Sequence, residues 1–200
     1  MRKLIVSIHS TANDIVTGAP SGDETELDWA QAGIQDSLDS FLASLEGVET
    51  ILLGRATYED LKRRWPEVGE SPDVPDVVRR MAEKVNTTPK IVVTDRHPVQ
   101  QPDWGAFDPP TQLTGPHAER RIAQLKEGGG GHIITFGSPT LVQSLTNAGL
   151  VDEYRILVHP VIASEGRRLF DNLTGPTHLR LIGTETFPSG AMLVTYAPAR

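Results

Sequence analysis

Two stretches of the sequence place a glycine where an apolar strand is expected to run into a helix. Residues 51–58 read ILLGRATY, so the forked cation Arg55 directly follows Gly54. Residues 133–141 read IITFGSPTL, in which Gly137 precedes an expected N-cap, Ser138, and a proline at the first helical position. Free backbone N–H groups and the positive end of the helix dipole lie together at the N-terminus of a helix, and this arrangement suits a phosphate. Two of them in a chain of 200 residues predict a dinucleotide site.

Arg55 supports this interpretation, because a cation is disfavoured at a helix N-terminus unless an anion lies beside it. The alternative is an ordinary surface cation. Thr57 is either a phosphate contact or the N-cap of a capping box with Asp60, and the two roles are compatible.

Composition limits what the chain can do. With 38% apolar residues we expect one domain over residues 1–200. A formal charge of −7 argues against nucleic acid and anionic membranes as partners. The absence of cysteine excludes thiol nucleophiles, zinc–thiolate sites and iron–sulfur clusters, so redox chemistry would need a bound cofactor. The apolar run after Met1 is too short for a signal peptide, and no apolar run in the sequence approaches the length of a membrane span. We therefore expect a cytoplasmic protein.

The apolar pattern predicts alternating strands and helices over the first three quarters of the chain. Strands are expected at residues 3–9, 50–53, 90–94 and from 133, with helices around 38–45, 55–66, 75–85 and 116–127. Residues 151–159, 179–187 and 192–196 then follow as strands without helices, and Pro188 to Gly190 form a hairpin turn. This order predicts an α/β fold with a mixed, mostly parallel sheet, an antiparallel C-terminal hairpin and helices on both faces.

Several common signatures are missing. The chain has no G-x-G-x-x-G after its first strand, no P-loop motif, no H-E-x-x-H and no G-x-S-x-G. The glycine run 128–131 lies between a helix and a strand, whereas phosphate loops lie between a strand and a helix, so we interpret it as a helix stop and linker. Five of the six histidines show no metal-ligand spacing and are assigned no site, namely His97, His117, His132, His159 and His178. We predict no metal site.

A set of motifs resembles the dihydrofolate-reductase-like superfamily, in the branch related to the reductase domain of the bifunctional riboflavin-biosynthesis deaminase-reductase. In chain order the motifs are LGRATY (53–58), VVTDR (92–96), GSPTL (137–141), GLVDEY (149–154), HPV (159–161) and RLF (168–170). The resemblance implies a three-layer α/β fold and bound NADPH. It also implies hydride transfer to a pterin-, pyrimidine- or flavin-precursor-like heterocycle, and pairing into a homodimer through the C-terminal strands.

Carried over position by position, the resemblance assigns the cofactor contacts. Gly54, Arg55, Ala56 and Thr57 would hold the phosphates, with Arg55 near the adenosine 2′-phosphate. Thr94 and Arg96 would flank the adenosine end, and Gly137, Ser138, Thr140 and Leu141 would cradle the pyrophosphate.

The chain departs from the family pattern at three places, one of which is residues 164–166, where Ser-Glu-Gly replaces the Gly-x-Gly that relatives often have before RLF. Where relatives commonly have Ser-Leu-Asp-Gly beside the nicotinamide, residues 11–14 read Thr-Ala-Asn-Asp. This change motivates an alternative hypothesis, a non-catalytic dinucleotide- or pterin-binding protein. The second of the usual paired glycines is Ser138, whose side chain either narrows the approach to the phosphates or donates its hydroxyl to them.

Asp28 is the candidate catalytic and substrate-binding acid. In dihydrofolate reductase an acid on an early segment grips the pteridine amidine, because two carboxylate oxygens match two N–H donors. The alternative is that Asp28 decorates a surface turn. Trp29 beside it is a second substrate-binding candidate, either a pocket wall or core residue or a stacking platform.

His9 ends the first expected strand on the face shared by Ile5 and Ser7. It is either a hydrogen-bonded interior histidine or a group that approaches the nicotinamide or substrate. Asp152 and Glu153 are adjacent in a strand and point to opposite faces, so we interpret both as structural.

Overall fold

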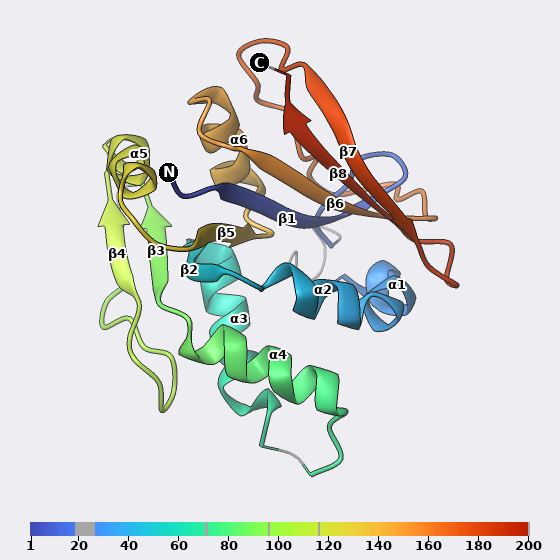
Figure 1. Ribbon diagram of the computed structural model, residues 1–200, viewed down its shortest axis with the longest axis horizontal. Coiled ribbons are helices and arrows are strands. Elements are labelled where there is room, and N and C mark those ends of the chain that lie inside the picture. The colour runs from blue at the N-terminus through green and yellow to red at the C-terminus, as the bar shows by residue number, and fades with distance from the viewer. Residues whose placement is uncertain (19–26, 71, 96, 116, 200) are drawn as a thin grey trace.

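One twisted sheet of eight strands organises the part of the chain that the computed structural model describes, residues 1–18, 27–70, 72–95, 97–115 and 117–199 (Figure 1). The strands are β1 (Leu4–Thr11), β2 (Val48–Gly54), β3 (Lys90–Thr94), β4 (Thr111–Thr114), β5 (His132–Phe136), β6 (Glu153–His159), β7 (Leu179–Thr186) and β8 (Met192–Pro198). Their order is β4-β3-β2-β5-β1-β6-β8-β7. All pairs from β4 to β6 are parallel, whereas β6–β8 and β8–β7 are antiparallel. The predicted mixed sheet with an antiparallel C-terminal hairpin is therefore confirmed.

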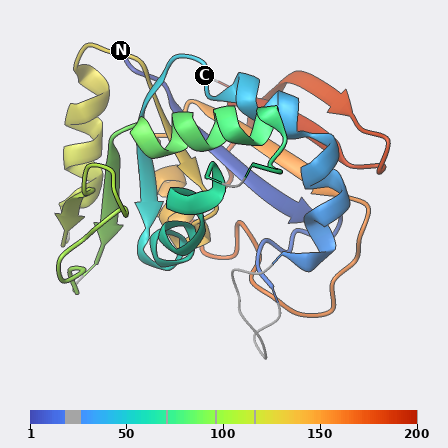
Figure 2. The same ribbon diagram turned by 90° about the horizontal axis from the view of Figure 1, so that it is seen from below.

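Helices cover both faces of this sheet. A short 3-10 helix η1 (Asp28–Ala30) precedes α1 (Gln31–Asp36), α2 (Leu38–Ser44), α3 (Arg55–Val68) and α4 (Asp76–Thr87), and α5 (Ala118–Glu127) and α6 (Pro139–Asn147) follow. Figure 1 shows α2, α3 and α4 below the sheet and α5 and α6 above it, and Figure 2 shows α1, α2 and α4 across the lower face. Among the described residues, no helix combines the length and the hydrophobicity needed to span a bilayer.

Strand β1 divides its side chains between two core layers. Leu4, Val6 and Ile8 pack with α5 and α6, while Ile5 belongs to the layer under α3 and α4. Because side chains alternate along a strand, Ser7 and His9 follow Ile5 to the lower face. Both line a cavity there, so the carboxyl half of the central strand supplies polar groups to an open site.

The observed helix and strand bounds differ from the predicted ones in three places. The helix expected around residues 38–45 is present as α2, but the short helix α1 before it was not predicted. α3 continues past Pro66 to Val68, since a proline already has a helical φ and near a helix end it costs little. The first strand reaches Thr11, two residues beyond the prediction, because it pairs with β6 as far as His159.

Candidate functional site

The two glycine junctions lie side by side, because β2 and β5 are neighbours in the sheet with Leu52 opposite Thr135. Ser138 joins them. Its Oγ accepts a hydrogen bond from the Gly54 N–H at 2.9 Å and donates to Thr57 Oγ1 at 2.9 Å. The Ser138 N–H donates to the same Thr57 oxygen at 3.1 Å. This three-residue bracket fixes the start of α6 against the start of α3.

The bracket changes two expectations. Ser138 occupies the N-cap position of α6, as predicted, but its side chain makes no capping bond to that helix because it is bonded to Gly54 and Thr57 instead. Its φ of 54° is left-handed, a conformation that glycine adopts without strain. The N-cap of α3 is Gly54, so Thr57 lies within the first turn and is not the cap of a box with Asp60.

Five backbone N–H groups at these helix starts remain without an intrahelical partner. The first three N–H groups of a helix have no carbonyl to bond, and Pro139 contributes none. The remaining donors belong to Arg55, Ala56, Thr57, Thr140 and Leu141, and all five residues line one cavity. The N–H groups of Gly54 and Ser138 are already bonded within the protein.

Another end of the cavity is formed by the end of β3 and the start of α5. Thr94 is buried and bonds Thr114 through the two hydroxyls at 3.0 Å. Asp95, Gly115 and Glu119 line the cavity beside it. Arg55 is exposed, and its guanidinium donates to the His97 carbonyl at 3.3 Å. Arg96, the other residue predicted here, lies outside the described residues.

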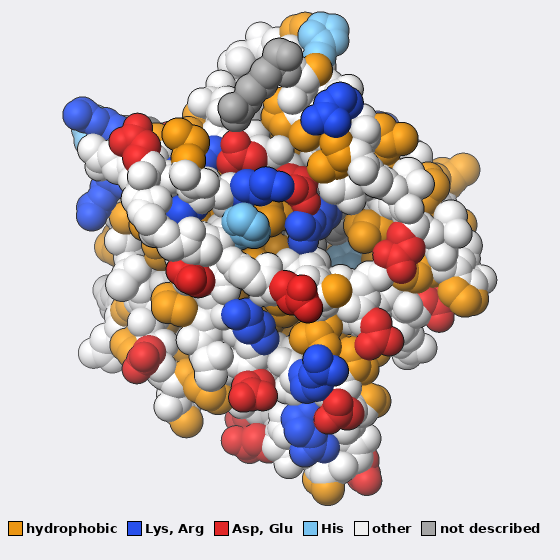
Figure 3. Space-filling view, viewed as in Figure 1, with side chains coloured by type: hydrophobic (Ala, Val, Ile, Leu, Met, Phe, Trp, Pro, Cys, Tyr) orange, Lys and Arg blue, Asp and Glu red, His pale blue; other side chains and the backbone are white. Residues whose placement is uncertain are grey.

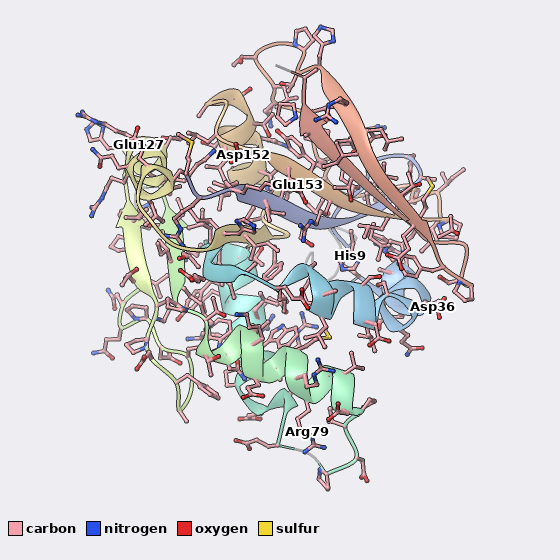
Figure 4. All side chains as sticks on the ribbon, viewed as in Figure 1. His9, Asp36, Arg79, Glu127, Asp152 and Glu153 are labelled. Carbon is pink, nitrogen blue, oxygen red and sulfur yellow. The ribbon has the colours of Figure 1, made fainter. Side chains whose placement is uncertain are left out.

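The cavity has a volume of about 1260 Å³ and extends from these helix starts to the space under α1 and α2. That second half is bounded by Ser7 and His9 from β1, Arg155 and Leu157 from β6, Leu193 from β8, and Ile34, Ser37, Leu38, Phe41 and Ser44 from α1 and its continuation into α2. Figure 3 shows a recess on this side of the molecule, and Figure 4 places His9 between β1 and α1. A dinucleotide and a second flat ring can share a space of this size.

Two histidines meet at the edge of this second half. His9 Nδ1 lies 3.1 Å from His159 Nε2, and the two ring centroids are 5.3 Å apart. Burial, followed by the neighbouring His159, lowers the pKa of His9 to about 4. Burial also lowers the pKa of His159, which is only 1% exposed. Both rings are therefore uncharged at neutral pH, and one of them must donate the shared hydrogen bond to the other.

The sequence offered two roles for His9, and the structure combines them: the ring is hydrogen-bonded to a buried partner and also lines the cavity. His159 was missed. The signal that could have found it is its position at the carboxyl end of a strand that pairs in parallel with β1, with Thr11 opposite His159. Parallel neighbours bring the residues at their carboxyl ends to one edge of the sheet.

Asp28 does not reach this cavity. It begins η1 with an exposed side chain and is not among the residues that line the space, whereas Gln31 and Ile34 of α1 are. The tight 3-10 turn buries Ala30 and leaves Asp28 toward solvent. The geometry thus gives the predicted catalytic role of Asp28 no support, and that role stays a prediction.

Trp29 is half-buried and does not line the cavity. Its Nε1 donates to the Thr17 carbonyl at 3.4 Å, and its ring meets His159 edge-on with centroids 5.2 Å apart. This placement matches a core or wall residue behind the histidine pair better than a stacking platform.

The loop after β1 retains a glycine-like shape despite its changed sequence. Asp14 has a φ of 69°, a left-handed conformation that Asp tolerates better than most residues. Asn13 ties the loop to the segment after β6: its Nδ2 donates to the Ala163 carbonyl at 2.8 Å, and its Oδ1 accepts from the Ala163 N–H at 3.1 Å.

Asp152 and Glu153 have structural partners, as predicted (Figure 4). Asp152 accepts from the Leu4 N–H at 2.8 Å and pairs with Lys126 at 2.6 Å. Glu153 pairs with Lys3 at 3.2 Å and with Arg155 at 2.6 Å.

Comparison with known proteins identifies the family. Residues 16–193 match the profile of the RibD C-terminal domain family, and the chain belongs to that family. A curated relative, the uncharacterized protein YyaP of Bacillus subtilis strain 168, is 26% identical over 195 residues, which are 98% of this chain and 94% of the relative.

Two solved structures share the fold. A putative riboflavin biosynthesis protein from Shewanella sp. PV-4 superposes with a TM-score of 0.70 at 20% identity and covers 99% of both chains. Dihydrofolate reductase from Enterococcus faecalis, solved in complex with NADP(H), superposes with a TM-score of 0.62 at 13% identity over 99% of this chain and 97% of that one. The fold is therefore the dihydrofolate-reductase-like fold that the motifs indicate.

Proposed function

We propose that the protein is an NADPH-dependent reductase that transfers a hydride to a pterin-, pyrimidine- or flavin-precursor-like heterocycle. The observation that carries the proposal is the group of five N–H donors on two adjacent helix starts that make no hydrogen bond among the described residues, and the five residues all line one cavity. Such donors suit the pyrophosphate of a dinucleotide. The NADP(H) bound in the dihydrofolate reductase of the same fold supports the choice of cofactor.

The residues divide the work by position. Bound NADPH would supply the hydride, while the bracket of Gly54, Thr57 and Ser138 holds the two phosphate-binding starts together. Arg55 would reach the 2′-phosphate, and Thr94 would lie beside the adenosine. The apolar walls under α1 and α2 would hold the heterocycle and exclude water from it.

Calorimetry with NADPH and NADH tests the cofactor assignment. Replacing Arg55 by Ala should weaken NADPH binding about tenfold or more, because a charge-assisted hydrogen bond to phosphate is lost. NADH affinity should stay unchanged. Arg79→Ala on α4 is the matched control, since it removes the same charge from an exposed residue that does not line the cavity (Figure 4). Binding of neither nucleotide by the unmodified protein would refute the proposal.

The alternative is a non-catalytic dinucleotide- or pterin-binding protein, and the changed loop at residues 11–14 is the observation that favours it. NADPH oxidation in the presence of dihydropterins and uracil derivatives separates the two. Nucleotide binding without oxidation of any of them would support the alternative.

We also propose that the protein is a homodimer. β7 forms the edge of the sheet next to β8, and Leu179, Leu181, Ile182 and Met192 on these two strands are exposed. Light scattering should give twice the mass of one chain, and Ile182→Glu should give the mass of one. A single-chain mass for the unmodified protein would contradict this proposal.

A further inference from the structure

The half of the cavity under α1 and α2 has a distinct chemical character. Its walls carry apolar side chains and serine hydroxyls. Among the described residues, His9 and Arg155 are titratable or charged groups there, and Arg167, next to Thr17 beyond the end of β1, also lines the cavity. Among the described residues, the acids that line the cavity are Asp60, Asp95 and Glu119, which come from α3, the end of β3 and α5. Both oxygens of Asp60 are already bonded, to Arg63 and Arg64.

Only one of the two ring nitrogens of His9 has a hydrogen-bond partner among the described residues. Its Nδ1 is occupied by His159 at 3.1 Å, and the described residues make no hydrogen bond to its Nε2 that we observe. Since His9 lines the cavity, Nε2 is the ring nitrogen available to a ligand there. When His159 donates the shared proton, His9 Nε2 carries a hydrogen and is a donor; when His9 donates it, Nε2 is an acceptor.

His159 cannot easily move away from this arrangement. A Cβ built on Gly33 of α1 would lie 2.6 Å from His159 Nδ1, so the helix backbone presses directly on the ring. Trp29 also packs against the His159 ring in a T-shaped contact. Ser37, one turn after Gly33, is buried as well. The imidazole of His159 therefore contacts both helix α1, which covers this half of the cavity, and the ring of His9.

We propose that His9 is the catalytic residue that hydrogen-bonds a ring carbonyl of the substrate through Nε2, that His159 is its positioning residue, and that the site prefers an uncharged ring carbonyl over a cationic amidine. This proposal rests on the reductase function above. In the reaction, a hydride from the reduced dinucleotide and a proton from solvent add across one ring double bond. The Nε2 hydrogen bond stabilises the negative charge that develops on the conjugated carbonyl oxygen, and His9 itself is left unchanged.

The ligand preference follows from charge. A carboxylate can neutralise an amidine that has gained a proton, but two uncharged imidazoles cannot. Among the described residues, the remaining charged group in this half of the cavity is the cationic guanidinium of Arg155. Its partner Glu153 does not line the cavity. The described residues therefore offer a buried cationic ring no counter-charge in this half of the cavity, whereas a neutral carbonyl finds a donor.

Two ligands of the same size test this assignment: pteridine-2,4-dione, which presents carbonyls, and 2,4-diaminopteridine, which presents an amidine. Binding of each is measured by fluorescence on the protein saturated with NADP⁺. The dione should bind at least about tenfold more tightly than the diamine, the difference expected for one well-formed hydrogen bond against an unpaired charge. Equal or tighter binding of the diamine, or binding of neither ligand, would overturn the proposal.

Variants then locate the effect. His9→Ala should weaken dione binding about tenfold and leave the NADPH dissociation constant unchanged, while His9→Gln, which retains an amide donor and acceptor, should restore part of the affinity. His178→Ala, at an exposed residue outside the cavity, is the control and should behave as the unmodified protein. Unchanged dione affinity in His9→Ala would remove His9 from the site.

A positioning role for His159 has its own signature. His159→Phe keeps a ring of similar size but removes the nitrogen that fixes the His9 tautomer. Nitrogen NMR of His9 should then show a changed ratio of the two tautomers together with weaker dione binding. An unchanged His9 spectrum would contradict the positioning role. Failure of NADPH to bind would refute the reductase function, whereas NADPH binding without dione preference would refute only the role of His9.

Discussion

The two halves of the cavity use different parts of the chain. The half at β2 and β5 offers backbone N–H groups on two helix starts, held together by Ser138 and Thr57. The half at β1 and β6 offers side chains, above all the His9–His159 pair with α1 pressed against it. Backbone donors carry no titratable proton, and each exists because of the local geometry of its own helix start, whereas the histidine pair depends on burial and on three separate elements.

This difference predicts that protonation in the acid range acts on the histidine half and not on the backbone donors. Its effect on the free energy of unfolding should be the largest effect predicted for this protein. The unfolded-state pKa of a histidine is about 6.5, and that of folded His9 is lowered to about 4. Between these values the unfolded chain takes up a proton that the folded protein refuses, so the free energy of unfolding falls as the pH drops from 6.5 to 4. The loss from His9 alone is about 3 kcal/mol.

Urea unfolding at pH 7 and at pH 4.5 measures this loss of unfolding free energy, with His9→Gln as the comparison. Between the two pH values, the unfolding free energy of the variant should fall by about 2–3 kcal/mol less than that of the unmodified protein. The carboxylates titrate in both proteins, so the difference reports on His9 alone. Equal losses would show that His9 is as easily protonated in the folded protein as in the unfolded one.

A methyl group at Gly33 should have the next largest effect. Gly33→Ala places a Cβ 2.6 Å from the His159 ring and 2.9 Å from Ala191 Cβ, so the helix or the ring must shift. Overpacking of this kind costs about 1–3 kcal/mol of unfolding free energy. Gly175→Ala is the control, since nothing lies within 4 Å of its Cβ position, and it should cost nothing. Denaturation that does not distinguish the two variants would mean that α1 is not pressed against His159.

The same contrast explains what the sequence could predict. The start of α3 is one continuous motif, Gly54 to Thr57, so its helix start and its donors can be inferred from adjacent residues. The alternation along β1 likewise predicted that His9 shares a face with Ile5 and Ser7.

Contacts between distant residues could not be inferred in this way. The Ser138 side chain was expected at its own helix, but it bonds residues 81 and 84 positions earlier. His9 and His159 are 150 positions apart and meet only because β1 and β6 pair. Asp28 was chosen because it is an acid on the expected segment, yet one 3-10 turn before α1 decides which way it points, and no periodic pattern marks so short a turn.

The bracket between the two helix starts gives the smallest predicted effect and the sharpest test of whether the halves are independent. Ser138→Ala removes the acceptor of the Gly54 N–H and the hydroxyl that reaches Thr57, which should cost about 1–2 kcal/mol of unfolding free energy. NADPH binding should weaken several-fold, because the five donors are no longer held at one separation, while the pKa of His9 should not change. Calorimetry and histidine NMR on the same sample measure both. Thr87→Ala, which removes a hydroxyl that bonds only its own helix, is the control. A shift in the His9 pKa in Ser138→Ala would show that the two halves are coupled through the sheet, since Ser7 of β1 accepts from the Gly137 N–H at 3.3 Å beside the bracket.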